Sequence, residues 1–209
     1  MFDCYFQSSN LKNTKFCYNF EIMTEDVQGL TYTPSFLTAN EEMDLLRRIN
    51  AQPWSTALKR RVQHYGRAYD YQSRALAAHP AEPLPDWLAA LAGRVGAVAP
   101  GNPRFDQVIV NEYTPGQGIS AHVDQPAAFG PVVATVSLGS DVVMDFARGS
   151  RTVPVLLERR SLACLDGPAR SAWTHGIAAR QSDMVHGRRR ARGTRVSITF
   201  RTVRPVQQF

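Results

Sequence analysis

The spacing of apolar residues predicts two helices in the first half of the chain. Thr38-Ala-Asn-Glu41 has the form of a capping box, in which Thr and Glu side chains satisfy free backbone amides at a helix start. We expect that helix to end near Asn50, with an apolar face of Met43, Leu45, Leu46 and Ile49. A second helix is expected over residues 86–98, after three prolines, with an apolar face of Trp87, Leu88, Leu91 and Val95.

After Pro103 the pattern changes to short runs rich in Val, Ile and Phe. Gly, Pro, Asp and Ser separate these runs, which is typical of strands joined by turns. The expected strands cover residues 105–113, 132–138, 142–146, 153–157, 161–165 and 195–203. Helices followed by strands predict the α+β class, with a double-stranded β-helix (jelly roll) core buttressed by the two helices.

A polar turn between two of these strands holds a His-x-Asp pair, His122 and Asp124. In an extended segment, residues i and i+2 point the same way, so an imidazole and a carboxylate can reach one metal ion. A short pattern of this kind is also common in turns, where it binds nothing. A third ligand is available downstream in His175 or His186. We favour His175, because Trp173 and Ile177 should fix its surroundings, whereas His186 is expected in a polar, mobile loop.

Two His and one carboxylate form the facial triad of non-haem Fe(II) oxygenases, which leaves coordination positions open for a co-substrate and dioxygen. Zinc hydrolases are the competing class, but their H-E-x-x-H motif is absent from this sequence. Iron chemistry of this type also needs a two-electron donor.

The last expected strand could bind such a donor. Its apolar residues Val196, Ile198 and Phe200 alternate with the polar residues Arg195, Ser197, Thr199 and Arg201. If the polar face lines the interior, two buried guanidinium groups require an anion. A dicarboxylate meets that need, so we expect Arg201 to bind the distal carboxylate of 2-oxoglutarate. Asn111 and Tyr113, which share a face of the strand before the His-x-Asp turn, could add hydrogen bonds to the same molecule. The alternative is an exposed edge strand whose arginines face solvent.

Length and composition favour one soluble domain over residues 23–209. The first 22 residues differ in composition and are interpreted as a leader or an extra segment. No stretch is apolar enough to cross a membrane, and the three cysteines lack metal spacing. We therefore expect a cytoplasmic monomer without membrane contact.

Positive charge is concentrated in the last third of the chain. From Arg151 onward, twelve Arg and no Lys stand against three acidic residues, a formal charge of +9. Such a lobe favours a nucleic-acid partner, because neutralising phosphates releases counterions. Arginines and aromatic rings also interleave over residues 53–75, and they either stack on an exposed base or cover the edge of the core. The candidate substrate-binding residues there are Arg61, Tyr65, Tyr69 and Tyr71.

Three motifs together resemble the AlkB family of Fe(II)/2-oxoglutarate dioxygenases. They are the run from Asn111 to Asp124, Trp173-Thr-His-Gly-Ile177, and Arg195-x-x-x-x-x-Arg201, and the likeness covers roughly residues 58–203. The resemblance implies a jelly-roll core and an N-terminal lid that handles a nucleotide. It also implies iron at His122, Asp124 and His175, and 2-oxoglutarate held by Asn111, Tyr113, Arg195 and Arg201.

The family's activity is oxidation of a substrate C–H bond with dioxygen while 2-oxoglutarate becomes succinate. Oxidative dealkylation of an N-alkylated base, flipped out or single-stranded, is the broader activity and our first expectation. DNA-repair members tend to carry an acidic residue two positions after the metal Asp, where this chain has Pro126. The runs 123–130, 137–145 and 159–167 are more similar to the branch that hydroxylates a modified wobble uridine in tRNA. Protein demethylation and a non-catalytic nucleic-acid-binding module are the remaining alternatives.

Overall fold

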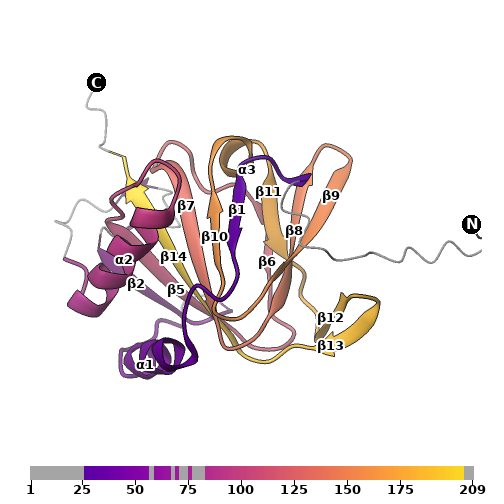
Figure 1. Cartoon of the computed structure of the whole chain (residues 1–209), viewed down its shortest axis with the longest axis horizontal. Coiled ribbons are helices and arrows are strands. Elements are labelled where there is room, and N and C mark those ends of the chain that lie inside the picture. The colour runs from indigo at the N-terminus through magenta and orange to yellow at the C-terminus, as the bar shows by residue number, and fades with distance from the viewer. Residues whose placement is uncertain (1–25, 57–58, 67–68, 71–74, 77–82, 205–209) are drawn as a thin grey trace, which may run out of the picture.

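Two antiparallel sheets that face each other form the body of the computed structural model, which describes residues 26–56, 59–66, 69–70, 75–76 and 83–204 (Figure 1). The larger sheet has the strand order β1-β10-β7-β14-β5-β2 and the smaller one β6-β11-β8-β9. The larger sheet consists of β1 (Leu30–Thr33), β10 (Leu162–Leu165), β7 (Phe129–Leu138), β14 (Arg195–Val203), β5 (Gln107–Tyr113) and β2 (Val62–Gly66). The smaller consists of β6 (Ile119–His122), β11 (Thr174–Ile177), β8 (Val142–Arg148) and β9 (Arg151–Leu157).

Two short two-stranded sheets and three helices complete the described chain. One sheet pairs β3 (Tyr69–Asp70) with β4 (Ala75–Leu76), and the other is a hairpin of β12 (Ser182–Val185) and β13 (Arg188–Ala191). The helices are α1 (Ala39–Asn50), α2 (Asp86–Val98) and α3 (Gly167–Ser171). The α+β jelly-roll class expected from the sequence is confirmed, although neither sheet closes on itself. Within the described ranges, no helix is long and apolar enough to cross a membrane.

The helices α1 and α2 cover the outer face of the larger sheet (Figure 1). The two faces of strand β14 fit this arrangement. Its apolar residues point into the core that the helices cover, and its polar residues point between the sheets. The outward residues are Val196, Ile198 and Phe200, and the inward ones are Arg195, Ser197, Thr199 and Arg201. The exposed-edge alternative for this strand is therefore excluded, because β14 lies between β7 and β5.

The space between the sheets is filled at one side and hollow at the other. Apolar side chains from β8, β9, β10 and β11 pack with α3 into one core cluster, which includes Phe146, Val155, Leu165 and Trp173. Where β14 and β5 face β6 and β11, polar side chains replace them and a cavity remains.

Helix α1 has the predicted capping box, but its buried face differs from the predicted one. The Thr38 hydroxyl accepts from the Glu41 amide at 3.2 Å, and the Glu41 carboxylate accepts from the Thr38 amide at 2.7 Å. Met43, predicted in the core, is 61% exposed, whereas Glu42 is 1% exposed. The helix is turned so that residues 42, 45 and 49, spaced i, i+3 and i+7, form the buried stripe.

Burial of Glu42 is possible because its carboxylate has specific partners. It accepts a hydrogen bond from the Gly139 amide at 2.8 Å and pairs with Arg159 at 2.6 Å. These contacts tie α1 to the ends of two strands.

Other segments also differ from the predicted pattern. Residues 62–66, which belong to the stretch of interleaved arginines and aromatic rings and were not among the expected strands, form strand β2 on the edge of the larger sheet. His186, expected in a polar loop, lies in the turn that joins the paired strands β12 and β13. Helix α3 was not predicted, because five residues carry too little periodicity to be recognised.

We expect Glu42→Ala to lower the free energy of unfolding by about 2–3 kcal/mol, because the Gly139 amide and Arg159 lose a charged acceptor. Met43→Ala on the next residue should change it by less than about 0.5 kcal/mol, because its side chain is exposed. Urea unfolding of both variants measures the difference, and equal losses would contradict the predicted role of Glu42.

Candidate active site

A cavity of about 930 Å³ lies between the two sheets. Its volume is in the upper part of the range for pockets that hold small molecules, about 300–1,000 Å³. Seven residues predicted to hold iron and 2-oxoglutarate all line this one cavity: Asn111, Tyr113, His122, Asp124, His175, Arg195 and Arg201. The fold thus brings together side chains that the sequence separates by up to ninety positions.

Three ligand atoms converge at the wall formed by β6 and β11. One atom each from His122, Asp124 and His175 lies within 4.8 Å of the others, which is close enough for one ion. Antiparallel pairing places the two His directly opposite each other, with ring centroids 4.5 Å apart. The Asp124 carboxylate lies 3.4 Å from His175 Nε2.

The donor set fits a divalent metal ion. His122 Nδ1 lies 2.8 Å from the Ser120 carbonyl oxygen, so it donates there and leaves Nε2 free to bind metal. Burial, and next the nearby His175, lower the pKa of His122, which favours the neutral imidazole that a metal requires. Burial opposes ionisation of Asp124, but Arg201 and the two histidines outweigh it and hold its pKa well below the ordinary range.

The backbone around Asp124 is held by a buried arginine on α3. Arg170 Nη1 donates to the Asp124 carbonyl oxygen at 2.7 Å, Nε donates to the Gly130 carbonyl oxygen at 3.1 Å, and Nη2 reaches that of Phe129. Burial lowers the pKa of Arg170. Arg170 therefore positions the backbone of a metal ligand. The sequence did not indicate this role, because the partners of Arg170 are backbone atoms some forty residues away.

The two arginines of β14 have different surroundings. Arg201 Nη2 lies 2.5 Å from Asp124 Oδ1, and its guanidinium stacks over the Phe129 ring at 4.6 Å. Arg195 is 3% exposed, and its Nη2 donates to the Ser137 hydroxyl at 2.8 Å. Burial lowers the pKa of Arg195 to about 10, and in the described chain no carboxylate pairs with it and its Nε has no hydrogen-bond partner.

Arg60 is a second functional candidate that the sequence did not single out. Its Nε donates to the Asn111 side-chain oxygen at 2.9 Å, and its guanidinium lies 5.8 Å from the centre of the Tyr113 ring. Arg60 and Lys59 both line the cavity.

Two of the predicted substrate-binding residues, Arg61 and Tyr65, do not line the cavity. Arg61 binds Glu112 with two hydrogen bonds of 2.6 and 2.8 Å and stacks over Trp54, on the helix side of the larger sheet. Tyr65 packs edge-on against Trp87 of α2, in the core-covering role that was the alternative. Neither lines the cavity, because side chains alternate along an extended segment. Tyr71 and the Tyr69 side chain lie outside the described residues.

Comparison with known families and proteins agrees with this geometry. Residues 29–201 match the family model of the 2OG-Fe(II) oxygenase superfamily. The chain belongs to this superfamily. Iron and 2-oxoglutarate are therefore confirmed as its cofactor and co-substrate.

Individual relatives place the chain among AlkB homologues, as the motifs predicted. The tRNA (carboxymethyluridine(34)-5-O)-methyltransferase ALKBH8 of Macaca fascicularis is 34% identical, and the match covers 84% of this chain. The chain spans only 30% of that relative's length. The "Probable RNA/DNA demethylase ALKBH6" of Danio rerio is 29% identical, with 87% of this chain and 88% of the relative covered.

The solved structure of OsALKBH1 has the same fold as this AlkB-type oxygenase. Its TM-score is 0.63 at 19% identity, with 83% of this chain and 96% of that chain covered.

For this oxygenase we expect Arg170→Met to weaken Fe(II) binding about tenfold or more, because residues that orient a metal ligand typically contribute that much. Anaerobic titration with Fe(II) against a competing chelator measures the affinity. Arg204→Met is the matched control, since Arg204 Nε donates to the Phe129 carbonyl oxygen at 3.0 Å without reaching Asp124. Equal Fe(II) affinity in both variants would contradict the positioning role.

Proposed function

We propose that this AlkB-type oxygenase oxidises a C–H bond of a base in nucleic acid, with a modified uridine of tRNA as the first candidate. The observation that carries the proposal is the shared cavity. It combines a His-Asp-His cluster with the buried guanidinium of Arg195, which has no carboxylate partner among the described residues. A non-catalytic binding module would need neither feature.

His122, Asp124 and His175 would hold Fe(II). Bound Fe(II) supplies a two-electron oxidation with dioxygen, in which one oxygen atom enters the substrate and the other enters succinate as carbon dioxide leaves. The chain's own contribution is to favour the neutral imidazole of His122 and to keep Asp124 ionised, so that these two ligands are ready without loss of a proton.

Arg195 is the better candidate for the distal carboxylate of 2-oxoglutarate. The sequence favoured Arg201, but that guanidinium already neutralises Asp124. A buried cation without a carboxylate partner is costly, and an incoming dianion removes that cost. The Arg guanidinium can bind a carboxylate through two parallel hydrogen bonds. Ser197 and Thr199 lie between the two arginines on the same face and can add hydroxyl donors.

The cavity also offers cationic groups for a nucleotide. Lys59 and Arg60 belong to its wall, and Arg60 is oriented by Asn111. Guanidinium groups stack on bases and bind phosphate, so this wall suits a base inserted from a nucleic-acid strand.

The relatives support a tRNA substrate. ALKBH8 at 34% identity is named for a uridine at position 34 of tRNA. Pro126 lies in an exposed turn after the metal loop, so the acidic group of DNA-repair members has no counterpart there. Oxidative dealkylation is the second candidate, supported by the ALKBH6 name.

Conversion of 2-oxoglutarate to succinate, measured separately with tRNA, methylated RNA and methylated single-stranded DNA, tests the proposal. We expect stimulation by tRNA and gain of one oxygen atom in a nucleoside, without formaldehyde. Formaldehyde release on a methylated oligonucleotide would establish the dealkylase instead. Absence of stimulation by every nucleic acid would refute both candidates, and Asp124→Ala serves as the inactive control.

Arg195→Met should weaken 2-oxoglutarate binding by on the order of 100-fold or more, since removing one partner of a buried charge pair costs about 3–5 kcal/mol. Fe(II) affinity should change little, because Arg195 does not touch the metal ligands. Arg201→Met should instead weaken mainly the binding of Fe(II), because Arg201 pairs with the metal ligand Asp124. Calorimetric titration of each ligand separates the two roles, and an unchanged 2-oxoglutarate affinity in Arg195→Met would move the co-substrate elsewhere.

A further inference from the structure

The β12–β13 hairpin is a well-formed element with no role in the proposed chemistry. Val185 pairs with Arg188, so the connecting turn has only two residues, His186 and Gly187. Both have positive φ, 50° and 71°, as a type I′ turn requires. This turn matches the twist of paired strands, so the hairpin has a defined shape.

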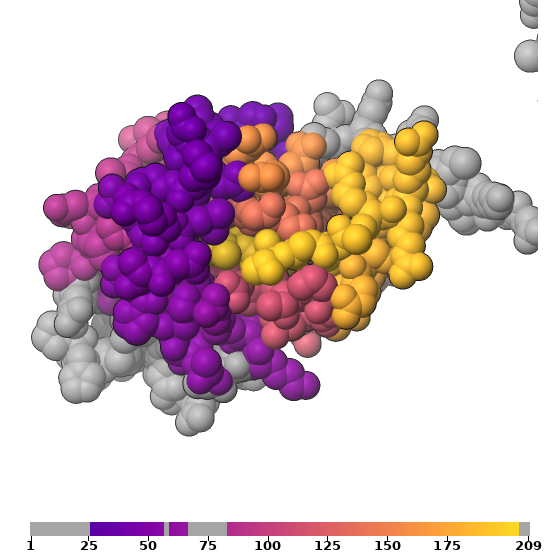
Figure 2. Space-filling model, turned by 90° about the horizontal axis from the view of Figure 1, so that it is seen from below, coloured from indigo at the N-terminus to yellow at the C-terminus, as the bar shows by residue number. Residues whose placement is uncertain are grey.

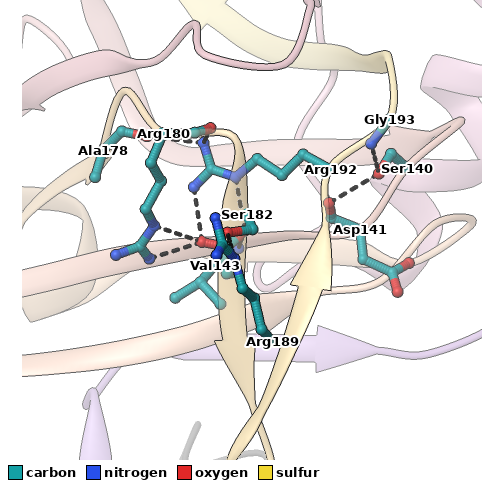
Figure 3. A network of polar contacts seen from close by, with 10 residues as sticks. Ser140, Asp141, Val143, Ala178, Arg180, Ser182, Arg189, Arg192 and Gly193 are labelled. Atoms are coloured by element: carbon teal, nitrogen blue, oxygen red, sulfur yellow. Dashed lines mark hydrogen bonds and ion pairs between the residues drawn. The ribbon is translucent and has the colours of Figure 1, made fainter.

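A buried carboxylate fixes the base of the hairpin to the smaller sheet. Asp183 is 4% exposed and accepts hydrogen bonds from Arg180 at 2.7 Å and from Arg192 at 2.7 and 2.8 Å (Figure 3). It also accepts from the Val143 amide of β8 at 3.2 Å. Burial opposes its ionisation, but the hydrogen bonds from Arg192 and Val143 outweigh it and lower the pKa of Asp183. Asp145 of β8 also interacts with Arg180 and Arg192, so two carboxylates face the two arginines at the base, and the positive charge of the hairpin lies on β13.

The far strand of the hairpin presents three consecutive exposed arginines. Arg189 Nε donates to the Ser182 hydroxyl at 2.8 Å, a neutral partner that orients the guanidinium without neutralising it. Arg190 is paired with Asp141. Arg188, Arg189 and Arg190 line a hollow of about 490 Å³ at the tip, together with Val185 and His186. Over residues 178–193, five arginines and one aspartate give a formal charge of +4.

The hairpin emerges from the rim of the active-site cavity. It follows β11, which carries His175, and precedes β14, which carries Arg195. The Gly116 amide donates to the Arg180 carbonyl oxygen at 3.2 Å, and Gly116 and Ala179 both line the cavity. In Figure 2 the hairpin forms a yellow lobe at the edge of the molecule opposite the indigo segment that includes α1. A strand whose base enters the cavity would therefore pass the hairpin on leaving it.

We propose that the β12–β13 hairpin is the arm that binds the phosphate backbone of the nucleic-acid substrate, with Arg188 and Arg189 contacting phosphates next to the base in the cavity. The inference rests on the proposed function, because it needs a nucleic-acid substrate. Guanidinium forks match phosphate geometry, and a fixed arm loses less entropy on binding than a loop does. Contacts of this kind position a strand without reading its sequence.

The test compares two variants of equal charge. Arg188→Gln with Arg189→Gln removes two positive charges from the arm. Arg104→Gln with Arg148→Gln removes two from exposed positions elsewhere, and Arg148 is the last residue of β8, where it pairs with Arg151 of β9. Binding of tRNA and of a single-stranded RNA oligonucleotide is measured by fluorescence anisotropy over a series of salt concentrations.

We expect the arm variant to bind RNA about tenfold or more weakly and its salt slope to fall by roughly 1 to 2, one unit for each lost phosphate contact. Its KM for RNA should rise with kcat unchanged, since phosphate contacts act on bound and reacting states alike. Succinate formation without RNA should stay at the wild-type rate, which shows an intact iron centre.

Equal RNA affinity and equal salt slope in the arm and control variants would refute the proposal that the hairpin binds phosphates. The proposed function would not be affected by that result. If the wild-type protein binds neither RNA nor DNA, and neither stimulates its turnover, both the hairpin's role and the proposed function are refuted. The two failures are therefore distinguishable in one set of measurements.

Discussion

The burial of two guanidinium groups on strand β14 is the constraint on which the active site depends. The strand lies in the middle of the larger sheet, so its inward face cannot be solvated from an edge. A buried cation is tolerated only with an anion or with hydrogen-bond acceptors. Asp124 supplies the anion for Arg201, and the Ser137 hydroxyl supplies only a neutral acceptor for Arg195. From this difference we propose that Arg201 supports the metal ligand Asp124 and that Arg195 binds a carboxylate.

The metal ligands are held by interactions that cross the fold. Asp124 follows β6, but its carboxylate contacts β14 and its carbonyl contacts α3. His122 and His175 come from strands that pair directly in the smaller sheet. A change at Arg170 or Arg201 therefore reaches the metal centre without touching an ion. Mutation of residues that orient metal ligands in this way typically lowers metal affinity or activity by about 10- to 100-fold.

Buried carboxylates on the outside of the sheets organise the rest of the molecule. Glu42 fastens α1 to the strand ends through Arg159 and a backbone amide. Asp183 fastens the β12–β13 hairpin to β8 through Arg180, Arg192 and another amide. In each case a carboxylate removed from water is matched by hydrogen bonds and by arginines, so its burial fixes a geometry. The exposed arginines of β13 therefore project from a hairpin whose base is fixed.

The sequence by itself determined what depends on local periodicity and spacing. The alternation in β14, the capping box at Thr38, the extent of both long helices and the His-x-Asp pair were all readable, because neighbouring residues decide them. Tertiary structure alone decided which of two neighbours faces inward. It buried Glu42 instead of Met43, directed Arg60 instead of Arg61 to the cavity, and paired Asp124 with Arg201 instead of Arg195. These choices depend on partners 51 to 117 residues away, whose positions follow from strand pairing and helix packing and leave no periodic signal in the local sequence.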